Sequence, residues 1–468
     1  MTSGWRTWAA ATGCVVAALA APALREPGLI QRALSALAPR VAARQAPFDP
    51  VSPSAPVVRL SVPGRVNAVP SMAARGAFVA VAWAATAGSR VDAFVAVSRD
   101  GGRSFGAPVR ANDVTGTVRA ATESGPRVAL GPPAAGKTDP EIVVVWTGRE
   151  PASTIRRTRS VDGGRTFEPS AALQGAGAPG SRGWASLSVN EPGEVRVAWL
   201  DHRGTPTASA GAHQHGVAPA AGGDHQHAGS ARAVDGKTVD AAAVAATMVK
   251  AQQSGFYLSS GSGPARELAR GVCYCCKTAL ASGPGGLVAA AWRHVYAGNL
   301  RDMAFITSRD GGRTFSAPVR VSADGWAIDG CPEDGPSVVI DATGVVHLAW
   351  PTVVKGSAEY KAIFYASSTD GVIVSPRVQV SPRNRSVAHP QILLNAAGAP
   401  VLLWDSTGPD RGVWMATRQP DGRFASPARV RAAVDASYPV AAVSGTEMLV
   451  AWLEQESASP TVRVQRLR

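Results

Sequence analysis

The residues of this 468-residue chain that are best suited to chemistry are cysteines. Val272-Cys-Tyr-Cys-Cys-Lys277 places three thiols within four residues, and Gly330-Cys-Pro-Glu-Asp-Gly335 adds a fourth. Thiolate sulfur is a ligand that favours copper(I) and zinc. The sequence therefore indicates a soft-metal site, with copper or zinc as the cofactor. The expected sulfur ligands are Cys273, Cys275, Cys276 and Cys331.

Two other interpretations of these cysteines stay open. An exported protein with an even number of cysteines typically forms disulfides, for example between Cys331 and one of the other three. Two ordinary disulfides suit C-x-C-C poorly, because adjacent cysteines pair only with strain. The remaining interpretation is a reactive redox thiol, and under both of these the protein has no cofactor.

Histidines gather in a segment that is rich in glycine, alanine and proline. Ala212-His-Gln-His-Gly216 and Asp224-His-Gln-His-Ala228 could capture a metal ion for the cysteines. A solvated insert without a function is an equally open interpretation, because such a composition cannot bury a core. The histidines that the metal hypothesis assigns as ligands are His213, His215, His225, His227 and His294.

A short β-rich run that ends in tryptophan recurs seven times and gives the chain its period. Most copies are spaced by about 50 to 60 residues, as expected for a four-stranded propeller blade. The tryptophans are Trp83, Trp146, Trp199, Trp292, Trp350, Trp404 and Trp452. The sequence thus predicts an all-β fold, a seven-bladed β-propeller of four-stranded antiparallel blades. A six-bladed propeller is the alternative.

The predicted propeller spans residues 57–468. Val57–Val62 reads as a strand without a blade, and pairing it with the C-terminal blade would close the ring and hide two sheet edges. The interval between Trp199 and Trp292 exceeds the period. The histidine-rich segment, at about 201–253, is therefore predicted to be a loop insertion, with a helix at Val239–Gln253.

A tight polar turn occurs at Ser98–Phe105, Ser160–Phe167 and Ser308–Phe315. Its serine and aspartate can bond backbone amides, its glycines can adopt positive φ, and its phenylalanine is an apolar plug. The pattern S-x-D-x-G-x-x-F resembles the Asp-box (BNR) repeat of the sialidase-like β-propellers. The residues that carry it are Ser98, Asp100, Gly102, Phe105, Ser160, Asp162, Gly164, Phe167, Ser308, Asp310, Gly312 and Phe315.

A second resemblance involves the cysteines. C-x-C-C-x-T at Cys273–Thr278, followed by D-G-W-x-I-x-G-C-P-x-x-G-P at Asp324–Pro336, is similar to a subgroup of exported bacterial proteins that are labelled sialidase-like. No activity follows from this resemblance.

The sialidase family implies three arginines for the substrate carboxylate, an aspartate acid/base and a tyrosine nucleophile activated by glutamate. Its Arg-Ile-Pro motif is missing here, and Gly64–Asn67 is a poor substitute. Tyr438 and Arg127 stand where strands begin on the expected ligand face, and Glu333 and Asp334 are carboxylates. No spacing fixes a pair of carboxylates at hydrolytic distance. A structural aromatic at the start of a strand is the simpler interpretation of Tyr438.

Strand alternation sorts the loops onto two faces. The Asp-boxes connect the third and fourth strands of their blades, so they occupy one face. The Cys segments, His202, His294 and His389 belong to the other face, around the central channel. We therefore expect a non-catalytic propeller that binds a metal ion or a partner (protein or glycan) through this face. An exo-α-sialidase-like glycosidase is the alternative.

The N-terminal segment and the net charge lead to the remaining predictions, which concern export and partners. Residues 1–23 read as a secretory signal, with Arg6 before the apolar run Ala9–Leu19, and 24–56 as a linker. The net charge of +13 comes without a basic run or interleaved aromatics, so we expect no nucleic acid partner. No later segment is apolar enough to span a membrane. We expect an exported monomer, periplasmic or extracellular, without a lipid anchor at Cys14.

Overall fold

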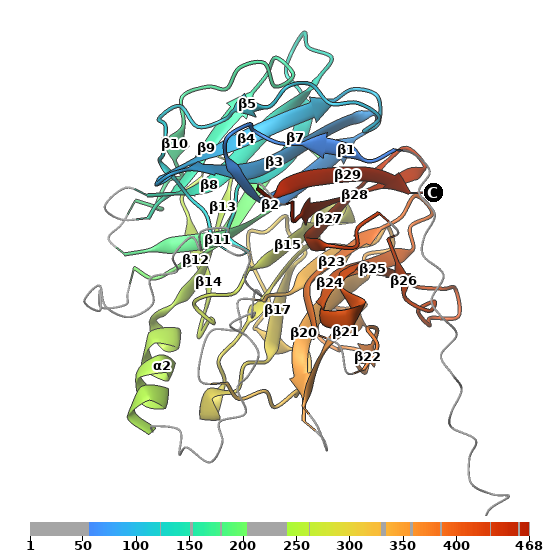
Figure 1. Cartoon of the computed structure of the whole chain (residues 1–468). Helices are drawn as coiled ribbons and strands as arrows, with labels where there is room; N and C mark the ends of the chain where they lie inside the picture. The colour runs from blue at the N-terminus through green and yellow to red at the C-terminus, as the bar shows by residue number, and fades with distance from the viewer. Residues whose placement is uncertain are drawn as a thin grey trace, which may run out of the picture. The chain divides into compact units, whose positions relative to one another are not determined.

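The structure is a computed structural model, and all residues that it describes lie in the compact unit Phe48–Arg468. It describes residues 56–467 except 122, 150–152, 178–179, 204–240, 262, 329–333, 356–358, 384–385, 431 and 457–458. These residues form seven antiparallel sheets that follow one another along the chain (Figure 1).

The first four blades each carry four consecutive strands, with one addition. The first has β2 (Val66–Arg75), β3 (Phe78–Ala87), β4 (Arg90–Ser98) and β5 (Val109–Arg110). The second has β7 (Arg127–Pro133), β8 (Pro140–Gly148), β9 (Ile155–Ser160) and β10 (Ala171–Ala172), with β6 (Val118–Arg119) also paired to β8. The third has β11 (Arg182–Val189), β12 (Val195–Asp201), β13 (Gly255–Ser260) and β14 (Arg266–Arg270). The fourth has β15 (Ala279–Ser282), β16 (Val288–Arg293), β17 (Met303–Ser308) and β18 (Val319–Arg320).

The last three blades complete the ring. The fifth has β19 (Ser337–Ile340), β20 (Val346–Val354), β21 (Tyr360–Ser368) and β22 (Val378–Gln379). The sixth has β23 (Ser386–Leu394), β24 (Pro400–Thr407), β25 (Gly412–Thr417) and β26 (Ala428–Arg429). The seventh combines β27 (Ala436–Ser444), β28 (Glu447–Glu454) and β29 (Thr461–Leu467) with β1 (Val58–Leu60).

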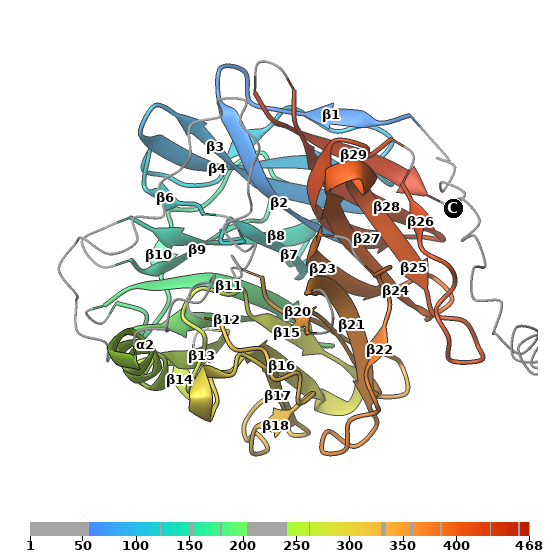
Figure 2. The same ribbon diagram turned by 60° about the horizontal axis from the view of Figure 1, so that its bottom comes forward.

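The sheets surround a common channel. The first strand of each blade contacts the first strand of the next, in the order β2, β7, β11, β15, β19, β23, β27 and back to β2 (Figure 2). The prediction of seven four-stranded blades is confirmed, and the six-bladed alternative is wrong.

The ring closes through the N-terminal strand. β1 pairs antiparallel with β29, with Val58 opposite Val464, so that the seventh blade takes its fourth strand from the start of the propeller. This is the predicted closure, and it covers one edge of β29 and one edge of β1 that would otherwise stay unpaired.

The period-marking tryptophans explain why the blades stack. Each one lies on the second strand of its blade and is at most 1% exposed. Trp146 of the second blade, for example, shares a cluster with Val95 and Ala84 of the first. Because a buried large aromatic contributes several kcal/mol, these side chains fix neighbouring sheets against one another.

The insertion in the third blade includes the helix α2 (Ala241–Gln253), close to its predicted bounds. Three short 3-10 turns lie at Pro284–Gly286, Ala297–Asn299 and Gly408–Asp410. Across the described residues, no helix is both long and apolar enough to cross a membrane. The predicted signal segment, the linker and Cys14 lie outside the described residues.

Candidate metal centre and channel mouth

The Asp-box turns act as braces on the face opposite the cysteines. In the turn after β9, Asp162 accepts hydrogen bonds from the amides of Arg165 at 2.9 Å and Thr166 at 3.1 Å. Ser160 donates to Asp162 at 2.8 Å and accepts from the amide of Gly164 at 2.9 Å. The turns after β4 and β17 repeat these contacts through Asp100 and Asp310. The phenylalanine of each turn packs against a core cluster.

Three of the predicted sulfur ligands come together between the third and fourth blades. Cys273 Sγ lies 3.8 Å from Cys275 Sγ and 3.6 Å from Cys276 Sγ. Their side chains are at most 2% exposed, and the three sulfurs form a buried group of a size that could hold a metal ion. Cys331, the fourth predicted ligand, lies outside the described residues.

The segment between β14 and β15 is held in place by backbone bonds to the end of β16. The amide of Cys273 donates to the carbonyl of Arg293 at 2.8 Å, and the amide of Val295 donates to the carbonyl of Gly271 at 2.8 Å. The two segments thus form a short irregular ladder, and the thiols point into the core shared by the third and fourth blades.

A buried arginine contacts the first thiol. Arg301 is 0% exposed, and its Nη1 donates to Cys273 Sγ at 3.0 Å. The Cys276 thiol also donates to Cys273. The hydrogen bond from Cys276 and the charges of Arg301 and Arg293 outweigh burial and lower the pKa of Cys273 to about 6. Burial raises the pKa of Cys276.

The two cysteines at either end of Cys273-Tyr-Cys-Cys276 are both free thiols, whereas Cys275 is not free. Sequence reasoning treated the cysteines as one set and missed that Cys273 and Cys276 have C-x-x-C spacing. That spacing was available in the sequence, and it commonly produces one acidic thiol beside a protonated one. In contrast, no sequence pattern indicated that Arg301 would contact a thiol.

The histidines do not join the sulfur group in the described part of the chain. Nδ1 of His294 accepts a hydrogen bond from the indole of Trp292 at 3.3 Å, and the His294 ring packs 4.4 Å from Tyr296. Burial lowers the pKa of His294 to about 4. The expectation that His294 lies with the sulfurs is therefore not met, since the ring faces its neighbours on the same ladder. His213, His215, His225 and His227 lie outside the described residues.

His202 also has a partner on its own blade. Its Nδ1 is 2.9 Å from the hydroxyl of Ser181, and burial lowers its pKa to about 4.

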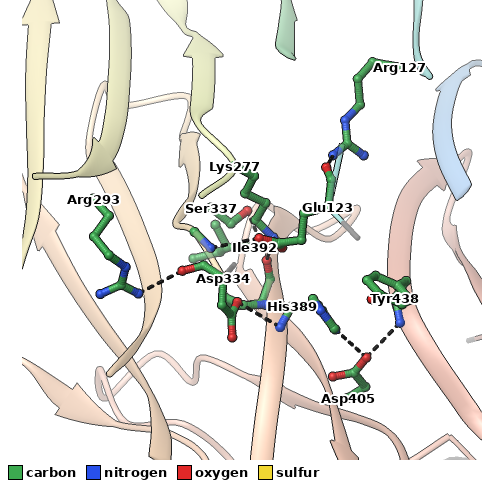
Figure 3. Close-up of polar contacts among 12 residues, drawn as sticks. Glu123, Arg127, Lys277, Arg293, Asp334, Ser337, His389, Ile392, Asp405 and Tyr438 are labelled. Carbon is green, nitrogen blue, oxygen red and sulfur yellow. Dashed lines mark hydrogen bonds and ion pairs between the residues drawn. The ribbon is translucent and has the colours of Figure 1, made fainter. Parts of the chain in front are cut away.

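The channel mouth carries a second polar cluster, drawn from five blades (Figure 3). Lys277, directly after Cys276, pairs with Glu123 at 2.9 Å, and both side chains are under a tenth exposed. The other oxygen of Glu123 accepts from the amide of Gly335 at 3.0 Å. Lys361 pairs with Asp334 at 2.5 Å. These contacts cross the channel and tie the second blade to the fourth and fifth.

His389 and Tyr438 continue this cluster onto the sixth and seventh blades. His389 Nδ1 lies 2.7 Å from Asp405 Oδ2, and the His389 amide donates to Asp334 at 3.1 Å. The Tyr438 amide donates to the same Asp405 oxygen at 2.8 Å, and its ring stacks on His389 at 4.0 Å (Figure 3). Burial by itself would lower the pKa of His389, but Asp405 and the other nearby carboxylates raise it.

Backbone strain accompanies these two side chains. His389 and Tyr438 have φ of 51° and 53°, at irregularities in the pairing of β23 with β24 and of β27 with β28. Val69 and Trp184 have the same positive φ at the corresponding irregularities of β2 with β3 and of β11 with β12, so this conformation recurs in the first strands of four blades. A positive φ is unfavourable for residues other than glycine.

The predicted catalytic candidates are dispersed in this cluster. Arg127 donates to the carbonyls of Glu123 and Ala185 and forms no ion pair with a carboxylate in the described part of the chain. Asp334 is committed to Lys361, and Tyr438 stacks on His389. Glu333 lies outside the described residues.

Two cavities flank the site. One of about 210 Å³ occupies the channel and is lined by Arg127, Lys277 and residues of all seven blades. A larger hollow, of about 640 Å³, lies on the Asp-box face between turns of the third and fourth blades. Its lining mixes acidic and basic side chains without cysteine or histidine, so it is not part of the candidate centre.

Comparisons with known proteins found similarity to solved structures at low sequence identity. No family model matches the chain, and no curated protein matches it. A protein of unknown function from Dyadobacter fermentans is 12% identical over 89% of this chain and 99% of its own, with a TM-score of 0.47. A Hadza microbial sialidase is 14% identical over 81% of this chain and 73% of its own, with a TM-score of 0.43. The GH93 α-L-arabinofuranosidase of Fusarium graminearum is 11% identical over 90% of this chain and 97% of its own, with a TM-score of 0.42.

Proposed function

We propose that this chain is an exported, non-catalytic propeller that binds a soft metal ion, copper(I), through Cys273 and Cys276. The observation that carries the proposal is a pair of buried free thiols 3.6 Å apart, with a guanidinium 3.0 Å from one of them. Thiolate ligands favour soft metals such as copper(I) and zinc over calcium and magnesium.

The donor set favours copper(I) over zinc. Structural zinc sites take four ligands, usually thiolates and imidazoles. The described residues bring three sulfurs together and no histidine, and with Cys275 in a disulfide two thiolates remain. Reduction of Cys275 would add a third sulfur to the same group. A zinc site would need further ligands from elsewhere in the chain.

Burial favours a metal ion over thiol exchange with another protein. Thiol–disulfide exchange requires direct attack by one sulfur on another, so the attacking thiol must be reachable. Cys273 and Cys276 are 1% and 2% exposed, which excludes a macromolecular disulfide in this conformation. A single ion can reach such a site through a small local opening.

The histidine pairs give the proposal a route for the ion. His-x-His at His213/His215 and His225/His227 suits copper before it is passed to sulfur. Export supplies the setting, because periplasmic and extracellular proteins meet copper outside the reducing cytosol.

The test is a competition between the mature protein and a chromogenic copper(I) chelator under strict reduction. A variant with all four loop histidines changed to alanine removes histidine binding, and Cys273→Ser/Cys276→Ser is then made in that background. We expect the parent without the four loop histidines to withdraw copper(I) from the chelator, and the double serine variant to lose at least about tenfold in affinity.

Cys275→Ser is the matched control, since it removes a neighbouring sulfur but leaves both free thiols. It should retain most of the copper(I) affinity, and circular dichroism should show that all variants fold. Equal copper(I) binding by the parent and the double serine variant would refute the proposal.

A glycosidase of the exo-α-sialidase type is the second candidate, favoured by Tyr438 at the channel mouth, whose ring stacks on His389 and whose amide donates to Asp405. The test is turnover of a fluorogenic sialoside by the wild-type chain and by Tyr438→Phe. Activity that the variant loses would support this candidate, and absence of turnover across the pH range would remove it.

A further inference from the structure

A buried arginine contacts one of the free thiols, and a second buried arginine donates to the backbone carbonyl of the first; among the described residues neither forms an ion pair with a carboxylate. Arg301 donates to Cys273 Sγ at 3.0 Å and to Asn299 Oδ1 at 3.1 Å. Its Nη2 is buried and has no hydrogen-bond partner. Within the described part of the chain, Arg301 forms no ion pair with an aspartate or glutamate, although it is 0% exposed.

Arg293 is a second buried arginine whose contacts are neutral groups. It is 1% exposed, and its guanidinium donates to three backbone carbonyls, those of Arg301, Asp334 and Pro351, at 2.8 to 2.9 Å. It also lies over the ring of Trp326, 4.6 Å from the centroid. Neither the carbonyls nor the indole carries a full negative charge.

The sulfur of Cys273 is therefore placed to balance the charge of Arg301. An uncompensated buried cation is costly, because the protein interior screens charge far less than water does. Of the two side chains to which Arg301 donates, Cys273 is the one that can carry a negative charge. Any cation that binds the sulfurs takes part of that compensation away.

We propose that Arg301, supported by Arg293, makes the dithiol site selective for monovalent over divalent ions. Copper(I) brings one positive charge next to the guanidiniums, and zinc brings two. The second charge meets the same guanidiniums at short range in a weakly screened interior, so it weakens zinc binding more than copper(I) binding. Arg301 is a specificity-determining residue that acts through charge, and this inference rests on the proposed metal function.

The test compares the ratio of copper(I) to zinc affinities among variants in the background that lacks the four loop histidines. Arg301→Met removes the charge and keeps an unbranched side chain, whereas Arg301→Lys keeps the charge. Arg293→Met removes the second charge from a different position, so the test survives if one variant does not fold. Arg196→Met is the matched control, a 4% exposed arginine that donates to Ser282 and Gly311 instead of sulfur.

We expect Arg301→Met to lower the copper-to-zinc ratio by at least about tenfold, mainly by strengthening zinc binding. Arg293→Met should shift the ratio in the same direction, while Arg301→Lys and Arg196→Met leave it near the parent value. Unchanged ratios in both methionine variants would overturn the selectivity inference while leaving the metal site intact. A parent that binds neither ion would instead overturn the proposed function.

Discussion

The Lys277–Glu123 pair offers the sharpest test of how the channel mouth is built. Lys277→Met removes an ammonium that is 8% exposed and lies 2.9 Å from a carboxylate that is 3% exposed. It also removes the hydrogen bond from Lys277 to the carbonyl of Pro390 at 3.0 Å. Glu123 would then be buried without its cation. Removing one partner of such a pair costs about 3–5 kcal/mol of unfolding free energy.

The assay is urea unfolding at neutral pH, followed by tryptophan fluorescence, to which the buried tryptophans of all seven blades contribute. Arg411→Met is the matched control, because the Arg411–Asp435 pair is about half exposed on both sides and should contribute less than about 1 kcal/mol. Combining Lys277→Met with Glu123→Gln should recover part of the loss, because the uncompensated charge is gone. A loss below about 1 kcal/mol for Lys277→Met, or strict additivity in the double variant, would refute the reasoning.

Three further predictions concern single positions. Gly335→Ala places a Cβ 2.1 Å from the carbonyl oxygen of Lys277, so it should lower the unfolding free energy by at least about 1–3 kcal/mol, and an unchanged urea midpoint would contradict this. The raised pKa of His389 means that its stabilising charge is present below about pH 6.5 and is lost as pH rises through the folded value. The stability difference between wild type and His389→Asn should therefore shrink with rising pH, and a growing difference would contradict the assignment. Slight burial opposes ionisation of Asp162, but hydrogen bonds from Thr166 and Ser160 lower its pKa to about 2. The contribution of Asp162 to the unfolding free energy is then fully present above about pH 4 and is lost as pH falls toward 2. If the stability of Asp162→Asn fell with acid as much as that of the wild type, the assignment would be contradicted.

The fold could be predicted because each blade repeats its own signal. The tryptophan of each second strand is buried for the same reason in every blade, and the Asp-box-like turn joins the third and fourth strands of three blades. One copy of this pattern would predict little, but seven copies at a regular spacing predict the whole fold. The pairing of β1 with β29 could be predicted because the sequence shows an N-terminal strand without a blade and a last blade that lacks its fourth strand.

The candidate site was less accessible to sequence reasoning. Topology brought the three cysteines to the correct face, but the contact between Cys273 and Arg301 depends on how two loops of one blade fold back. Glu123 and Gly335 are 212 residues apart and meet only because the ring closes. The contact between His294 and Trp292 could have been predicted from the sequence. The two residues are two positions apart at the end of β16, so their side chains lie on the same face, and the indole of Trp292 donates to His294.

The central claim is that sulfur from Cys273 and Cys276 holds the metal. X-ray absorption at the copper edge, on full-length mature protein loaded with equimolar copper(I) under reduction, tests this directly. The proposal predicts a coordination shell made of sulfur, which is lost in Cys273→Ser/Cys276→Ser. A shell of nitrogen alone, unchanged in that variant, would place the metal on the histidine-rich insertion and contradict the account.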